Sequence, residues 1–458
     1  MKIKRQAWQL LFLLFFSLGN DSILAQVRFF KGYGMGEGSC VLPTKSGGYI
    51  CVGVSQSALV PPASQVEYIL TDLRGQVIWQ HSDKSYKSEI AFSVVECSDG
   101  GFIIVGRGVT SLDHWGGGPA YGFYFKVDEF GNVVWRRSLS NHGSEIRCIR
   151  PTTDGNYIMT GMSSGGIFLM KIDEDGTTIL FKSLGYPIYP SNSSIEQTSD
   201  GGYVIGWMSD SSRILKTNSE GEKEWVRVFS PGYYSSVAVQ TRDECYAFAF
   251  STSDSFGLYT ALIKLDKFGN ILWNKKLCKG QGEAYSLQST PDNGFVISGS
   301  LYSGGNYSVM LLKANASGDS SWLKNFGGNN YDRGFYVHNT PDNGFIITGN
   351  AYYCGCIIKT DEFGNACAYG NDTLPLSQIA DQTGFAIFPN PTSDLSMIEL
   401  KENIYAKISV YNNLGQLLIA QNIQQFSTFD FSSFPTGQYL IMAEQINGKA
   451  FAVKLIKQ

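Results

Sequence analysis

Four histidines, His81, His114, His142 and His338, are the first candidates for acid–base or metal chemistry in this chain of 458 residues. A zinc hydrolase often carries two histidines four residues apart around a glutamate, and none of the four has such a partner. The glycine–lysine run that holds nucleotide phosphates is also missing. The sequence therefore offers no motif for zinc-hydrolase or nucleotide chemistry, although carboxylates from separate segments could still form a glycosidase pair.

Adjacent acidic residues supply the oxygen ligands that calcium prefers. They occur at Asp128-Glu129, Asp173-Glu174-Asp175 and Asp361-Glu362. All three groups lie in one recurrent turn, and asparagine replaces the aspartate in two other copies of that turn. The spacing also differs from that of an EF-hand loop. We therefore expect these acids to form turns, and we expect no metal and no cofactor.

Nine cysteines raise the question of disulfides. Cys356 and Cys367 flank a tight turn on strands that are expected to pair, so a disulfide between them is one prediction. Zinc is the rival interpretation for these two and Cys354, but no histidine lies near them and a second Cys pair is lacking. Cys40 and Cys148 occupy equivalent places in different repeats, and we expect them to be buried as small apolar side chains.

Aromatic residues outside any regular pattern are candidate ligand contacts, because flat rings with polar neighbours suit sugars or peptide segments. Some of them could simply cover the surface of the fold. The candidate ligand-binding residues are His114, Trp115, Tyr121, Tyr189, Trp207, Tyr233, Tyr234, Tyr302, Tyr331, Asp332 and Arg333, with Tyr186 and Tyr307 beside them.

A sequence motif that occurs seven times, called the repeated phrase below, defines the scaffold that must position these residues. Each copy has a glycine-rich turn with an aromatic residue, an apolar strand, a Lys-x-Asp-x-x-Gly turn and usually a tryptophan. The second-turn glycines stand at 75, 131, 176, 221, 269, 318 and 364, which is 45 to 56 residues apart. One copy, residues 284–326, resolves into four short strands. Repeats of this length and strand number are typical of a β-propeller blade.

The ends of the repeat array predict how the ring closes. The seventh copy has Ala368 where most others have tryptophan, and it lacks a good outer strand. The segment Val27–Gly34 resembles the outer strand of the sixth copy. If it completes the last blade, both sheet edges disappear. We therefore predict an all-β fold: a seven-bladed β-propeller with an N-terminal closure strand, then a small C-terminal β-sandwich.

Two turns of each blade should lie on one face, and the variable connections should lie on the other. Function usually resides in such loops over a rigid scaffold. The recurrent tryptophans keep a fixed place in the outer strand, so we expect them to pack between blades. They are Trp79, Trp135, Trp225, Trp273 and Trp322.

Composition and segment boundaries complete the outline. Residues 1–25 have a basic start and a short apolar run, which predict a secretory signal peptide rather than a membrane anchor. The propeller should span 26–370, a polar linker 371–383 and the C-terminal domain 384–458. A formal net charge of −4 without basic runs argues against nucleic-acid binding. No later segment is apolar enough to cross a membrane.

The last 75 residues carry a specific resemblance. They resemble the C-terminal sorting domain of Bacteroidota proteins exported by the type IX secretion system. The matching residues are Pro389, Asn390, Pro391, Gly415, Gly437, Tyr439 and the terminal segment with Lys454. The propeller repeats resemble DGGY and KTDxxGNxxW repeats of exported proteins from the same bacteria.

The resemblance implies passage from the periplasm across the outer membrane by the type IX machinery. The protein would then be released or attached to the outer-membrane surface. We expect a propeller that binds a glycan or a surface protein through its loops without catalysis. A propeller-fold polysaccharide lyase or glycoside hydrolase is the alternative, and a purely structural surface component is a third.

Overall fold

A computed structural model describes residues 27–55, 64–83, 88–109, 120–139, 145–186, 192–230, 232–255, 257–279, 282–369, 372–373, 385–388, 392, 395–400, 405–412, 416–424, 426–445 and 450–457. The chain divides into two compact units, with one boundary between Asp372 and Thr373. The predicted signal peptide and most of the predicted linker lie outside the described residues.

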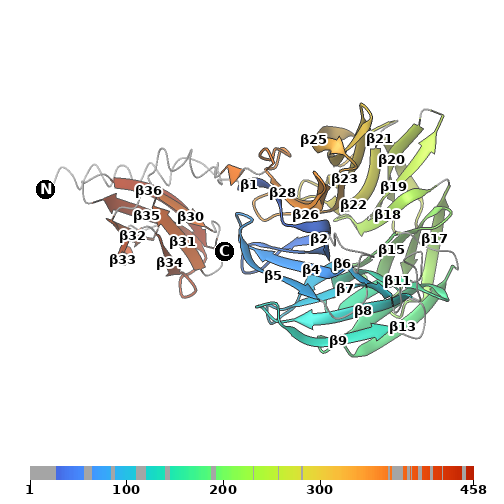
Figure 1. Cartoon of the computed structure of the whole chain (residues 1–458), viewed down its shortest axis with the longest axis horizontal. Coiled ribbons are helices and arrows are strands. Elements are labelled where there is room, and N and C mark those ends of the chain that lie inside the picture. Colours follow the sequence, from blue (N-terminus) through green and yellow to red (C-terminus); the bar gives the residue numbers. More distant parts are fainter. Residues whose placement is uncertain are drawn as a thin grey trace. The chain divides into compact units, whose positions relative to one another are not determined.

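The first unit, Arg28–Asp372, contains seven antiparallel sheets in chain order (Figure 1). The first strands are β2 (Met35–Pro43), β6 (Ser88–Glu96), β10 (Glu145–Pro151), β14 (Asn192–Gln197), β18 (Tyr233–Gln240), β22 (Gly282–Ser289) and β26 (Arg333–Asn339). The second strands are β3 (Tyr49–Ser55), β7 (Phe102–Val109), β11 (Tyr157–Ser163), β15 (Tyr203–Met208), β19 (Tyr246–Asp254), β23 (Phe295–Ser303) and β27 (Phe345–Ala351). The third strands are β4 (Val66–Thr71), β8 (Ala120–Val127), β12 (Gly166–Ile172), β16 (Ser212–Thr217), β20 (Gly257–Leu265), β24 (Asn306–Ala314) and β28 (Cys354–Thr360). The fourth strands are β5 (Val77–Asp83), β9 (Val133–Leu139), β13 (Thr178–Gly185), β17 (Lys223–Phe229), β21 (Ile271–Leu277) and β25 (Ser320–Asn330).

The first strands pack against one another around a ring. β2 contacts β6, β6 contacts β10, and the contacts continue through β14, β18, β22 and β26. β26 in turn contacts β2, so the circle is closed. Each first strand therefore lies innermost in its sheet, and the fourth strands lie outermost. The predicted β-propeller class is confirmed.

The closure strand is also confirmed. β1 (Arg28–Gly32) pairs antiparallel with β28, and Phe30 stands opposite Ile358. The sheet order is β26-β27-β28-β1-β29, where β29 (Asp372–Thr373) is a two-residue strand at the edge. β1 thus takes the place that a fourth strand takes in the other sheets, and it covers the edge that β28 would otherwise expose.

The recurrent glycine and tryptophan of the phrase contact each other across successive sheets. A β-carbon at Gly364 would lie 2.6 Å from the ring of Trp322, and one at Gly318 would lie 2.6 Å from Trp273. Both glycines have positive φ, so the position requires glycine for two reasons. The predicted packing role of the tryptophans is confirmed at these sites.

At the closure, Phe29 of β1 replaces the missing tryptophan. Its ring would lie 2.7 Å from a β-carbon at Gly75, and it meets Tyr49 edge-on at 5.9 Å. The side chain is fully buried. Tyr33 donates a hydrogen bond from Oη to the carbonyl of Gly75 at 2.8 Å. The last and first sheets are therefore joined by the same kind of contact as the others.

An ion pair inside six of the seven sheets was not foreseen from the sequence. In six sheets the lysine that precedes the Asp-x-x-Gly turn bonds the aspartate of the glycine-rich turn, as Lys359 does with Asp342 at 2.8 Å. The equivalent lysines are Lys126, Lys171, Lys216, Lys264 and Lys313. In the first sheet Ser46 and Leu70 stand at these two positions. Each sheet therefore has both the lysine and the aspartate or neither of them. Because one buried charge without the other would be costly, the pair stabilises the sheet.

The second unit is a pair of sheets around one core. One sheet has the order β30 (Phe385–Phe388), β31 (Leu395–Leu400) and β34 (Phe426–Asp430). The other has the order β33 (Leu417–Gln424), β32 (Tyr405–Tyr411), β35 (Gly437–Gln445) and β36 (Ala450–Lys457). Ile398 of the first sheet and Ile408 and Ile441 of the second belong to one buried cluster. This is the arrangement of a small β-sandwich.

Candidate functional site

Chain direction assigns the two faces of the ring. The first strand of each sheet ends in the glycine-rich turn, and the Asp-x-x-Gly turn returns to the same face. We call this the turn face. The connections from second to third strands and from sheet to sheet lie on the opposite face, which we call the loop face. The candidate ligand contacts on the loop face are residues that differ from the repeated phrase.

Three predicted tyrosines meet on the loop face at the sixth sheet. Tyr302 and Tyr307 stand opposite each other on β23 and β24, with ring centroids 5.0 Å apart. Tyr331 follows β25 and stacks on Tyr307 at 5.5 Å with an interplanar angle of 24°. Tyr331 is 71% exposed and Tyr302 is 44% exposed. We call these three residues the tyrosine patch.

The neighbours of the patch have structural roles. Asp332 is 1% exposed, and its carboxylate accepts a hydrogen bond from the N–H of Tyr352 at 3.2 Å. It therefore fixes the connection that carries Tyr331 and does not face a ligand, which corrects the expectation for this residue. The backbone N–H of Arg333 donates a hydrogen bond to the side-chain oxygen of Asn350 at 3.0 Å. Burial raises the pKa of Glu37, and the positive charge of the Arg333 guanidinium offsets part of that rise.

A tyrosine pair in the next hairpin escaped sequence reasoning. Tyr352 and Tyr353 both have positive φ, at 52° and 63°, where the equivalent hairpin of the sixth sheet has Gly304 and Gly305. Bulky residues rarely adopt this backbone conformation, and such strain often accompanies function. Tyr353 is 71% exposed. The positive φ could not be read from the sequence, because two adjacent tyrosines predict an extended strand.

Two predicted ligand residues lie in the core instead. Trp207 is 1% exposed and packs against Tyr186 at 5.2 Å. Tyr121 is buried, and its Oη donates to Glu89 at 2.6 Å. Tyr121 stands on β8 after a long connection and Trp207 stands on β15 before a short one, and the sheet pleat turns both rings inward. The backbones of Tyr233 and Tyr234 belong to β18, but their side chains lie outside the description, as do His114, Trp115 and Tyr189 entirely.

The predicted disulfide is wrong. No disulfide joins Cys356 and Cys367, because β1 pairs with β28 in the place where the strand bearing Cys367 was expected. The thiol of Cys367 contacts the carbonyl of Arg28 at 3.0 Å, and Cys356 stands opposite Gly32. Cys40 and Cys148 are buried and free, as expected from the repeat positions.

The acidic groups of the turns bond protein atoms. The carboxylate of Asp128 accepts hydrogen bonds from the N–H groups of Phe130 and Asn132 at 3.0 and 2.8 Å. Cys97, Asp99 and Glu174 are close enough to one another to hold a cation. The ammonium of Lys126 already bonds both carboxylates there, at 2.7 and 2.9 Å. A second positive charge at that point would be repelled.

One hydrolase-like pattern is present in the letters of the sequence. Residues 161–165 read Gly-Met-Ser-Ser-Gly, which matches the nucleophile-elbow pattern. That elbow joins a strand to a helix, whereas Ser163 ends β11 in a hairpin to the antiparallel β12. Its hydroxyl contacts the N–H of Gly165 and the carbonyl of Gly166. The structural context therefore does not support a nucleophile.

A cavity of about 910 Å³ runs along the first strands of all seven sheets. Toward the loop face it is lined by Phe92, Arg147, Tyr285 and Phe335. The guanidinium of Arg147 lies 4.0 Å from the ring centroid of Phe92 and pairs with Glu145 at 2.7 Å. The rings of Tyr285 and Phe335 meet edge-on at 5.4 Å. We call this cavity the central channel.

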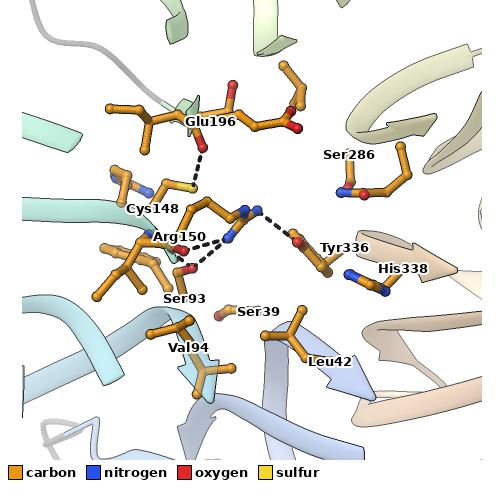
Figure 2. A pocket seen from close by; sticks show the side chains of 18 of the residues that line it. Ser39, Leu42, Ser93, Val94, Cys148, Arg150, Glu196, Ser286, Tyr336 and His338 are labelled. Atoms are coloured by element: carbon orange, nitrogen blue, oxygen red, sulfur yellow. Dashed lines mark hydrogen bonds between the residues drawn. The ribbon is translucent and has the colours of Figure 1, made fainter. Parts of the chain in front are cut away.

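Deeper in the channel, Arg150 crosses from the third sheet to the seventh (Figure 2). Its Nη2 donates to Tyr336 Oη at 2.7 Å, and its Nη1 donates to Ser93 Oγ at 3.3 Å and to the carbonyl of Ile149 at 2.7 Å. His338 and Glu196 lie at the same level (Figure 2). Sequence reasoning missed this layer, although Arg150, Glu196, Gln288 and His338 all stand two residues before the threonine that opens their turn.

Burial controls the two titratable side chains beside Arg150. Burial lowers the pKa of His338, and its Nδ1 lies 2.7 Å from the carbonyl of Asn339. The imidazole is therefore neutral at pH 7 with Nδ1–H donating, so Nε2 is an acceptor. Burial raises the pKa of Glu196 to about 7, while the Gln240 N–H and Arg150 act in the opposite direction.

Glu196 makes the stability of the propeller depend on pH. Because its folded-state pKa is raised, its favourable contribution is complete below about pH 4.5 and is lost as the pH rises through about 7. We expect Glu196→Gln to raise the free energy of unfolding at pH 8 by about 2–3 kcal/mol and to change it little at pH 4. Urea unfolding followed by tryptophan fluorescence measures this, since residues 384–458 contain no tryptophan. Equal effects at both pH values would contradict the assignment.

The sorting-motif residues that the structure describes belong to the sandwich. Tyr439 is buried on β35, and its Oη donates to the carbonyl of Pro435 at 2.5 Å. Gly437 begins β35, and Lys454 stands opposite Leu440 on β36. Pro389, Asn390, Pro391 and Gly415 lie outside the described residues.

Residues 386–458 match the family model of a secretion system C-terminal sorting domain. Such a domain marks proteins that are exported by the type IX secretion system and are attached to the cell surface or released. The chain is therefore a secreted, propeller-like protein with a type IX sorting domain. No curated protein matches it by sequence. Among the residues that the structure describes, no helix has the length and hydropathy needed to cross a bilayer.

Solved structures with a similar course of the chain have low sequence identity. A protein of unknown function from Bacteroides caccae is 13% identical with a TM-score of 0.40, over 60% of this chain and 93% of that one. The extracellular domain of a putative hybrid two-component system from B. thetaiotaomicron is 10% identical with a TM-score of 0.47, over 94% of this chain and 57% of that one. Sqt1 from Chaetomium thermophilum is 11% identical with a TM-score of 0.47, over 82% and 96%.

Proposed function

We propose that this secreted propeller binds a glycan on its loop face through the tyrosine patch. The observation that carries the proposal is the contact of Tyr302, Tyr307 and Tyr331, whose rings form a continuous and largely exposed surface. Exposed aromatic surface of this kind is costly in water and often marks a binding site. Flat rings bury the apolar faces of sugars while the phenolic hydroxyls bond their edges.

The patch is held in place by its surroundings before any ligand arrives. Tyr302 and Tyr307 flank a two-residue hairpin turn, Gly304-Gly305, whose positive φ angles suit the twist of paired strands. Tyr331 is tied to β24 by a bridge to Tyr307, and Asp332 ties the same segment to the next hairpin. A preformed surface loses little conformational entropy on binding.

Glycan retention without turnover is the expected result for the mature full-length chain. A glycan array identifies the ligand, and a reducing-end assay on the best-bound glycan tests for cleavage. Release of new reducing ends or of unsaturated sugars would favour the lyase or glycosidase alternative. Failure to retain any glycan, with capture of one envelope protein, would replace the glycan by a protein partner.

A further inference from the structure

Arg150 is a half-buried cation whose hydrogen-bonding capacity is only partly used. A guanidinium has five N–H groups. Those of Nη1 bond Ser93 and Ile149, and one of Nη2 bonds Tyr336. Among the described residues, none accepts from its Nε–H or from the second N–H of Nη2, and no carboxylate there pairs with it. Such a charge favours an anionic partner, because a half-buried cation without a counter-ion is only partly solvated.

We propose that the central channel is a second binding site, in which Arg150 and Tyr336 bind the carboxylate of a sugar acid. The Nε–H and Nη2–H groups match the forked geometry of a carboxylate. Tyr336 accepts from Arg150 through its oxygen, and none of the described residues accepts its O–H proton. The Tyr336 hydroxyl therefore lies beside the guanidinium with its proton still available. A carboxylate at this position would accept three hydrogen bonds, from Nε–H and Nη2–H of Arg150 and from the O–H of Tyr336.

The rest of the channel suits the ring of a sugar rather than a small inorganic anion. Its volume of about 910 Å³ falls in the range of organic ligand pockets. The hydroxyls of Ser39 and Ser286 lie around Arg150 (Figure 2), and His338 Nε2 is an acceptor at the same level. Phe92, Tyr285 and Phe335 line the approach from the loop face. Hydroxyl partners below aromatic walls are the chemistry that sugars require.

Glu196 is the carboxylate near Arg150 whose negative charge would repel a bound anion. It stands on β14 next to Arg150 on β10, and the facing titratable groups are Cys148 on β10 and Tyr336 and His338 on β26 (Figure 2). One of its oxygens accepts from the N–H of Gln240 at 3.3 Å. Removing its charge should therefore strengthen binding of an acid and leave binding of a neutral sugar unchanged.

Isothermal titration of the full-length mature chain with D-galacturonate and D-glucuronate tests the site, with their methyl esters as uncharged matches. We expect one acid to bind about 10- to 100-fold more tightly than its ester. Arg150→Gln should remove that preference, Arg150→Lys should retain part of it, and Tyr336→Phe should weaken it by about tenfold. Glu196→Gln should increase affinity for the acid.

The matched control is Arg242→Gln, which removes an exposed guanidinium on the turn face that donates to the carbonyl of Pro291. Tryptophan fluorescence of each variant verifies that the propeller is folded. Equal affinity for acid and ester, unchanged binding by Arg150→Gln, or absence of binding for both acids would overturn the proposal. Each of these outcomes leaves glycan retention by the tyrosine patch to its own assay, since the two sites use different residues.

Discussion

Phe29→Ala lowers the free energy of unfolding of the propeller by about 3–5 kcal/mol, the usual cost of truncating a buried phenylalanine. The ring of Phe29 fills the space over Gly75 and packs against Tyr49, so the variant opens a cavity between the last and first sheets. Deletion of residues 27–34 removes the whole of β1 and exposes the edge of β28, and the loss is larger still. Urea unfolding followed by tryptophan fluorescence measures both changes.

Ile78→Ala is the matched control for this substitution. Ile78 lies on β5, the fourth strand of the first sheet, and it is 58% exposed, so its truncation should change stability by less than about 0.5 kcal/mol. Equal stability of wild type and Phe29→Ala would show that β1 does not close the ring. A large loss in both variants would show that the outer strands matter generally and that the closure has no special role.

Deletion of residues 386–458 keeps the protein in the periplasm. These residues match the sorting domain as a continuous segment, and their buried core is made within the two sheets of the sandwich. We expect the truncated protein to disappear from the medium and the cell surface, while its propeller remains folded. Immunoblots of periplasm, surface-exposed protein and medium follow the change in a type IX-competent host.

A core substitution in the sandwich separates sorting from mere chain length. Ile441→Asp places a charge in the buried cluster and should also block export, because a charge without a partner is not tolerated there. Normal surface exposure of either variant would mean that the segment is dispensable for export. Trp322→Ala, which weakens the propeller alone, should still be exported if folded.

The repeated phrase was sufficient to predict the class of fold and its closure, because both depend on contacts that recur. The glycine, the tryptophan and the turn aspartate each appear many times, so their average role is visible in the sequence. The Lys–Asp pair of the other six sheets could have been found as well, since Ser46 and Leu70 replace both members together in the first repeat. The signal was the simultaneous replacement of two residues in one repeat, and not a sequence motif.

The candidate site was only partly predictable. Tyr302, Tyr307 and Tyr331 break the phrase at loop positions, and the structure brings them together. Trp207 and Tyr121 also depart from the repeated motif, but they lie on strands with their side chains directed into the core. The direction of a side chain depends on the strand register, which cannot be read directly from a sequence. Arg150 and Glu196 were missed because they stand on the first strands of different sheets, β10 and β14, and only the closed ring places them together.

Equilibrium affinity for the array-selected glycan is the most direct test of the account, measured for the wild type and for Tyr331→Ala. Tyr331 is largely exposed and stacks on Tyr307, so its removal should weaken binding by about 2 kcal/mol, or roughly 30-fold, while the unfolding midpoint stays unchanged. Undiminished affinity in a folded Tyr331→Ala protein would contradict the central claim that the tyrosine patch binds the ligand.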